Sequence, residues 1–169
     1  MRPTNVPPGS SSRDGGSGAG DRRIDSTESA VAAVMEMADS YGRETTVEHS
    51  IGADQSGRRL ASGAFTVVDP DGSLLHEAYI EIAGRPTVCM EIFSEGDASI
   101  TVDTVEFIGV PREQLPAFLD AVYGGRAWVR GRRFPPTLHL IVPIPGDVTY
   151  KEPILGPWNM TPWLNGLIR

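Results

Sequence analysis

The sequence predicts an α+β domain in which an antiparallel meander sheet of five to seven strands is covered on one face by two helices, with a docked C-terminal segment. Three observations favour this fold. Two stretches carry apolar residues at helical spacing, and several short segments alternate apolar and polar residues between turn signals. No helical pattern interrupts the strand-like segments between the two helices, which is typical of a meander and not of βαβ units.

The length and composition fit one folded domain preceded by a tail. The chain has 169 residues, of which 40% are hydrophobic. Residues 1–25 are rich in Pro, Gly and Ser and are predicted to be disordered, so the domain comprises residues 26–169. No apolar run approaches the roughly 20 residues that span a bilayer. No secretory signal is recognisable either, so we expect a cytoplasmic protein without a membrane partner.

Two helices are predicted from capping residues and apolar spacing. The first begins at Asp25 or Ser26, either of which can cap it, and ends at Gly42. The second occupies residues 111–123, and Pro116 must lie in its first turn because proline further along would kink it. A Gly-Gly pair follows and ends this helix.

The strands are predicted from period-2 alternation between turn signals. They occupy residues 44–53, 59–69, 73–83, 87–94, 98–110, 126–131 and 137–143. Residues 151–169 are assigned to a terminal segment that docks on the core through Trp158 and Trp163. Within it, Thr161 and Pro162 form the cap and first residue of a short final helix.

The formal net charge of −7 is unevenly distributed along the chain. Residues 26–122 contain 17 acidic and five basic residues, whereas residues 123–169 contain two acidic and six basic residues. The acidic excess argues against general nucleic-acid binding, because phosphates would be repelled.

The alternation of the strands predicts an acidic face that also carries aromatic side chains. The face opposite the core should combine carboxylates with aromatic rings, which suits a basic protein partner because aromatic rings anchor and carboxylates steer. The partner-binding candidates are Glu77, Tyr79, Glu81, Glu91, Phe93 and Asp103, the last placed on the strand 98–110 beside Val105 and Phe107. A solvated sheet face without a partner explains the same pattern, and a homodimer through this face also stays open.

A basic strip is predicted near the second helix. The alternating side chains of Arg126, Trp128, Arg130 and Arg132 share one face of a strand. They could pair with the acidic residues inside the fold, or stack on nucleic-acid bases.

No motif for catalysis, metal binding or cofactor binding is found, so we expect none of the three, and the sequence favours a binding role over an enzyme. The single cysteine, Cys89, excludes an internal disulfide and is expected to be an ordinary thiol. His76 is expected on the core face of its strand. Acid–base chemistry would require the fold to bring a histidine to a carboxylate pair, for example His49 to Glu77 and Glu81.

An alternative function is a small-molecule binder or enzyme with a pocket between the sheet and the C-terminal tryptophan segment. Trp158 and Trp163 lie in sequence near the cations Lys151 and Arg169, which motivates this alternative.

The domain resembles the small acidic α+β immunity proteins encoded beside bacterial polymorphic toxins. The resemblance lies in its size, the meander after a first helix, the helix entry at residues 110–119, the acidic face, and the use of arginine in 14 of 15 basic positions. It implies a cytoplasmic inhibitor that covers a basic toxin cleft through its acidic face.

Overall fold

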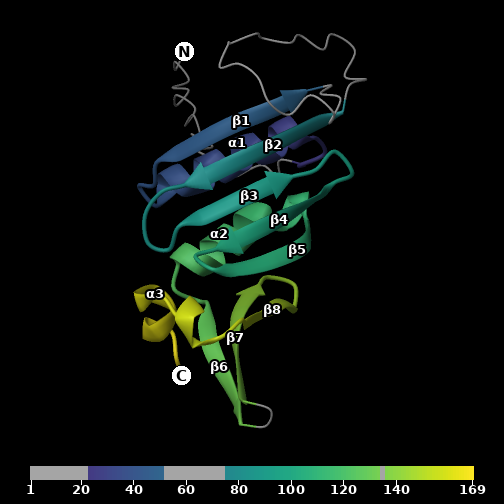
Figure 1. Ribbon diagram of the computed structural model, residues 1–169. Helices are drawn as coiled ribbons and strands as arrows, with labels where there is room; N and C mark the ends of the chain where they lie inside the picture. The colour runs from purple at the N-terminus through teal and green to yellow at the C-terminus, as the bar shows by residue number, and fades with distance from the viewer. Residues whose placement is uncertain (1–22, 52–74, 134–135) are drawn as a thin grey trace, which may run out of the picture.

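The structure, a computed structural model, describes residues 23–51, 75–133 and 136–169. It has an α+β fold with one five-stranded and one three-stranded antiparallel sheet (Figure 1). In chain order the elements are α1 (Thr27–Ser40), β1 (Thr45–Ile51), β2 (His76–Ile82), β3 (Val88–Ile92), β4 (Asp97–Val102), β5 (Val105–Pro111), η2 (Arg112–Gln114), α2 (Leu115–Tyr123), β6 (Trp128–Arg133), β7 (Pro136–Ile144), β8 (Val148–Ile154), η3 (Pro157–Asn159) and α3 (Pro162–Gly166).

The first sheet is the predicted meander, with strand order β1-β2-β3-β4-β5. Helices α1 and α2 lie together behind it, so in the described part of the chain helices cover one of its faces and leave the other without a helix (Figure 1). The strand expected at residues 59–69 lies outside the described residues. No described helix is both long and apolar enough to cross a membrane.

The caps predicted for the first helix are present. The Ser26 hydroxyl oxygen accepts a hydrogen bond from the Ser29 backbone N–H at 3.1 Å. The helix ends as Gly42 takes a φ of 62°, a conformation that glycine adopts without strain. At the other end, the buried hydroxyl of Thr27 donates to the backbone carbonyl of His76 at 2.7 Å, which fastens the helix to β2.

The prediction of one long strand over residues 98–110 is wrong. These residues form β4 and β5, which pair as a hairpin around Asp103 and Thr104. Asp103 takes a φ of 52°, a conformation that aspartate tolerates better than most residues. As a consequence Val105 and Phe107 are buried in the core and do not share a face with Asp103.

The second sheet was only partly predicted. Strands β6 and β7 match the expected segments, but β8 takes up residues that were assigned to the terminal segment. The strands therefore divide into two sheets instead of forming a single one.

The C-terminal segment docks on the core through one of its two tryptophans. Leu164 is fully buried, and Trp163 and Leu167 pack against the core. The predicted cap is present, because Thr161 accepts the Leu164 N–H at 3.2 Å. Trp158 is 82% exposed, so its expected docking is wrong.

Three aromatic rings join the two sheets. Phe118 of α2 lies edge-on to Phe107 of β5, with ring centroids 5.1 Å apart, and to Tyr150 of β8 at 5.6 Å. Phe107 and Phe118 are fully buried. The second sheet is thus held against the first by a shared core and not by a flexible linker.

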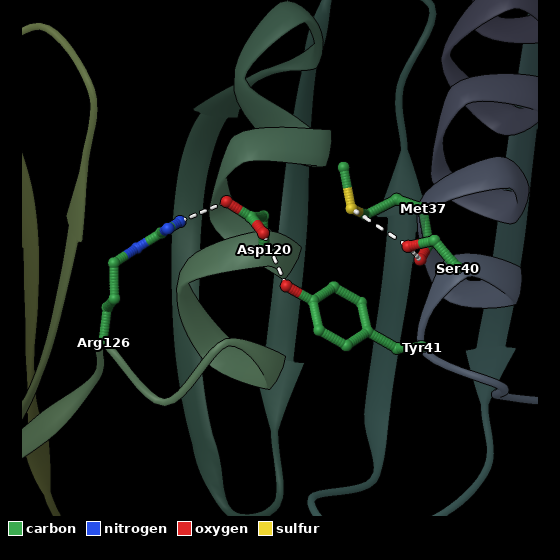
Figure 2. A network of polar contacts seen from close by, with 5 residues as sticks. All are labelled: Met37, Ser40, Tyr41, Asp120 and Arg126. Atoms are coloured by element: carbon green, nitrogen blue, oxygen red, sulfur yellow. Dashed lines mark hydrogen bonds and ion pairs between the residues drawn. The ribbon is translucent and has the colours of Figure 1, made fainter.

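A polar network at the ends of the two long helices fixes the entry to the second sheet (Figure 2). The Asp120 carboxylate accepts from the Tyr41 hydroxyl on one side and pairs with the Arg126 guanidinium on the other. Nearby, the Ser40 hydroxyl donates to the Met37 backbone oxygen at 2.6 Å and lies 3.8 Å from its sulfur. Arg126 comes two residues before β6, so this network orients that strand relative to α2.

Candidate protein-binding face

The strand register brings five of the six predicted site residues onto one face of the first sheet. Tyr79 pairs with Glu91, and Glu81 pairs with Cys89, in the β2–β3 ladder. Glu77 and Phe93 continue this row at the next open-face positions of β2 and β3. The residues between them, Ile80, Met90 and their neighbours, are buried under the helices. We call the opposite side the acidic face.

Tyr79 lies at the centre of four carboxylates. Glu48 of β1 is directly opposite it on one side and Glu91 of β3 on the other. Glu77 and Glu81 lie two residues before and after it on its own strand, and therefore on the same face. Tyr79 is 43% exposed. Its aromatic ring is therefore surrounded by these four carboxylates, and part of its surface is open to solvent.

Sequence reasoning missed several members of this face. Glu48 and Glu106 extend it to the two edge strands, and Asp97 carries it to the start of β4. Ile108, 74% exposed, adds an apolar side chain at the β5 edge. The alternation of residues 44–53 could have placed Glu48 on the open face of its strand. The strand order was needed to place it beside Tyr79.

The charge of the acidic face is unbalanced within the described strands. The open-face positions of β1 to β5 hold six carboxylates and no basic side chain. The carboxylates are Glu48, Glu77, Glu81, Glu91, Asp97 and Glu106.

The electrostatics of Tyr79 reflect these neighbours. A hydrogen bond with the Cys89 thiol, followed by partial burial and by the negative charges of nearby Glu81 and Glu48, raises the pKa of Tyr79 to about 12. The phenol is therefore neutral at physiological pH and offers a donor on a face of acceptors. Cys89 is half-buried on the same face and is a free thiol.

Asp103, the sixth candidate, does not lie on this face. One of its carboxylate oxygens accepts the Thr87 backbone N–H at 3.0 Å, and the other accepts the Thr161 hydroxyl. Asp103 thus fastens the β4–β5 turn to the β2–β3 turn and to the cap of α3, which is a structural role.

The histidine and carboxylate combination considered from sequence is not assembled. His49 pairs with Ala78 on the helix-covered side of the sheet, whereas Glu77 and Glu81 face the other way. The His49 Nδ1 lies 2.9 Å from Nε2 of His76, so the two histidines bond to each other across β1 and β2. Among the described residues, no group of three or more candidate ligands could hold a metal ion.

The basic strip is mostly not used in internal pairing. Arg126 pairs with Asp120, as expected if the basic strip pairs with acidic residues inside the fold. Arg130 and Arg132, by contrast, are exposed, and no carboxylate of the described residues forms an ion pair with either of them.

Comparisons with family models, curated proteins and solved structures gave no match for this chain.

Proposed function

We propose that this protein is a binding module that captures a basic protein partner through its acidic face. The observation that carries the proposal is the arrangement around Tyr79, where carboxylates on three strands surround a half-exposed aromatic ring. Charge of one sign over a whole face raises the association rate with a partner of opposite charge and rejects others.

The aromatic and apolar side chains of the face supply the anchors. Binding energy at protein interfaces is concentrated in a few large side chains that become desolvated, with tyrosine prominent among them. Tyr79 is central, and Phe93 and Ile108 lie toward the margins of the face. A basic partner that places an arginine beside Tyr79 gains ion pairs and a cation–π contact together.

A homodimer through the same face is disfavoured by its charge. In a two-fold symmetric dimer the same patch meets itself, so glutamates would oppose glutamates. A different, basic chain is the better occupant. The immunity-type resemblance supplies one such occupant, a cationic toxin blocked stoichiometrically in the cytoplasm.

The test uses two charge reversals on the face and one matched control. Glu48→Lys and Glu81→Lys each change the net charge by two and remove one carboxylate next to Tyr79. Asp39→Lys makes the same charge change at an exposed position of α1, on the far side of the sheet. The three variants and the wild type serve as baits for proteins of the native cell at low and high salt, and the captured partner is then purified and titrated.

The proposal predicts a basic partner, bound one to one, whose affinity falls at least tenfold for the face variants and stays unchanged for Asp39→Lys. The melting temperatures of all four baits should show that the face variants remain folded. Equal affinity of the face variants and the control, or a partner that is itself acidic, would contradict the proposal.

A further inference from the structure

The second sheet carries a basic face that the proposed function does not use. On one side of this sheet Val129, Leu140 and Val142 are fully buried. Because side chains alternate along each strand, the other side presents Trp128, Arg130 and Arg132 of β6, His139 of β7 and Lys151 of β8. We call this side the basic face.

The C-terminal residues complete the basic face with one further cation. Ile168 forms a parallel bridge with Val129 at the free edge of β6. The Val129 N–H donates to the Leu167 carbonyl at 2.9 Å, and the Arg169 N–H donates to the Val129 carbonyl at 3.3 Å. This pairing sets the Arg169 guanidinium over the Trp128 ring, 5.9 Å from its centroid.

The positive charge of this face is not neutralised locally. Arg126, just before β6, is bound by Asp120, but among the described residues no carboxylate forms an ion pair with Arg130, Arg132, Lys151 or Arg169. The surroundings also act on His139, whose pKa is lowered by burial and by the neighbouring charges of Lys151 and Arg132, with a smaller opposing effect of Glu152. The face is thus a positive region on a protein of negative net charge.

A pocket of about 300 Å³ opens on the basic face, lined by Trp128, Arg130 and Arg169. This volume lies at the lower end of the range of small-molecule sites, roughly 300–1,000 Å³. Its lining combines two planar guanidinium groups, which match phosphate oxygens in geometry and charge, with an indole ring that can stack on a planar ring.

We propose that this pocket binds a nucleoside phosphate, with the phosphates held by Arg130 and Arg169 and the base against the Trp128 ring. A small ligand suits the site better than a polynucleotide, because a long polyanion would extend from this limited basic face toward the acidic part of the molecule. The inference rests on the second sheet and the C-terminal residues that pair with it, and it is independent of the proposed function.

Calorimetric titration of the full chain with adenosine diphosphate tests the site, with inorganic phosphate and adenosine titrated separately. We expect saturable one-to-one binding, and at least tenfold weaker binding of each separate component because neither fills both halves of the site. Arg130→Gln should weaken adenosine diphosphate binding roughly tenfold or more, since it removes a charge-assisted contact to phosphate.

Two control variants make the result specific. Arg85→Gln loses the same charge at an exposed position of the β2–β3 turn, and Trp158→Phe alters an exposed tryptophan that does not line the pocket. Both control variants should bind adenosine diphosphate with the affinity of the wild type. Trp128→Leu should bind it more weakly, because the adenine base loses its stacking contact with the indole ring. The proposal is overturned by absence of binding at millimolar ligand, by equal effects of Arg130→Gln and Arg85→Gln, or by tighter binding of a single-stranded oligonucleotide than of adenosine diphosphate.

Discussion

Charge reversal at Glu81 should strengthen the fold while it weakens partner capture. Glu81 is exposed on the acidic face, diagonally across the β1–β2 ladder from Glu48, because Glu48 pairs with Tyr79 two residues earlier. Like charges on neighbouring strands repel, so the native state pays an electrostatic penalty for this pair. Glu81→Lys turns that repulsion into attraction.

The size of the effect follows from the spacing of diagonal positions. Such neighbours are about 7–8 Å apart, and two unit charges at that distance interact by about 0.5 kcal/mol in water. Reversal of one sign therefore stabilises the fold by about 1 kcal/mol at low ionic strength. Screening with a Debye length of about 8 Å reduces this gain to about 0.4 kcal/mol in physiological salt.

Urea unfolding at low and physiological salt measures the change, since urea is uncharged and guanidinium chloride would itself screen the pair. A double-mutant cycle with Glu48→Gln isolates the interaction. In the Glu48→Gln background, the gain from Glu81→Lys should fall by about 1 kcal/mol at low ionic strength, which is twice the repulsion energy of the pair. A gain that is independent of both salt and Glu48, or a loss of stability, would refute the reasoning.

Four further outcomes are expected. Phe118→Ala should destabilise the fold by about 3–5 kcal/mol in thermal unfolding, because a fully buried ring that joins both sheets is lost. Asp120→Asn should cost about 1 kcal/mol at neutral pH. The hydrogen bond from Tyr41, together with Arg126, lowers the pKa of Asp120. The loss of stability in Asp120→Asn should therefore be present above a pH of about 4 and should disappear as the pH falls through the lowered pKa of Asp120. Urea unfolding of both proteins at a series of pH values measures this difference. Stability should decline between pH 10 and about pH 12, as the tyrosines of the unfolded chain lose their phenolic protons before native Tyr79 and Tyr123, whose pKa values are both raised to about 12. Cys89→Ala removes the largest cause of this shift and should bring the ionisation of Tyr79, followed by NMR, closer to pH 10.

Much of the first sheet could be predicted from the sequence, because buried and open-face side chains alternate regularly along its strands. The buried residues Ile80 and Met90 and the open-face residues Tyr79 and Glu91 were separated by period 2 alone. The Ser26 cap could also be predicted from the sequence, since a serine directly before an apolar helical stretch commonly caps the first backbone N–H groups of the helix.

The β4–β5 hairpin was missed because its turn contains neither glycine nor proline. Val102, Asp103, Thr104 and Val105 read as a continuous strand, and only the phase of the buried residues changes there. A non-glycine residue with positive φ gives little warning in sequence. The same error placed Asp103 on the acidic face.

The second sheet was harder to predict for a different reason. Strand β8 contains Lys151, Glu152 and Pro153, and proline is unusual in a paired strand. The pocket depends on the pairing of Ile168 with Val129, a contact between residues far apart in the sequence. No local pattern predicts such a contact. The sequence placed a pocket beside Trp158 and Trp163, whereas the pocket on the basic face is lined by Trp128.

The aromatic core shared by the two sheets has a consequence at long range. The two sheets lie at opposite ends of the molecule (Figure 1). Because Phe107, Phe118 and Tyr150 hold both sheets in one body, the negative charge of the acidic face and the positive charge of the basic face keep fixed positions relative to each other. The protein is therefore a permanent electric dipole as well as an anion. A dipole rotates in the field of an approaching charged body before any contact forms, so a basic partner is met preferentially by the five-stranded end. This orienting effect is strongest in dilute salt, because a Debye length of about 8 Å at physiological ionic strength confines it to short distances.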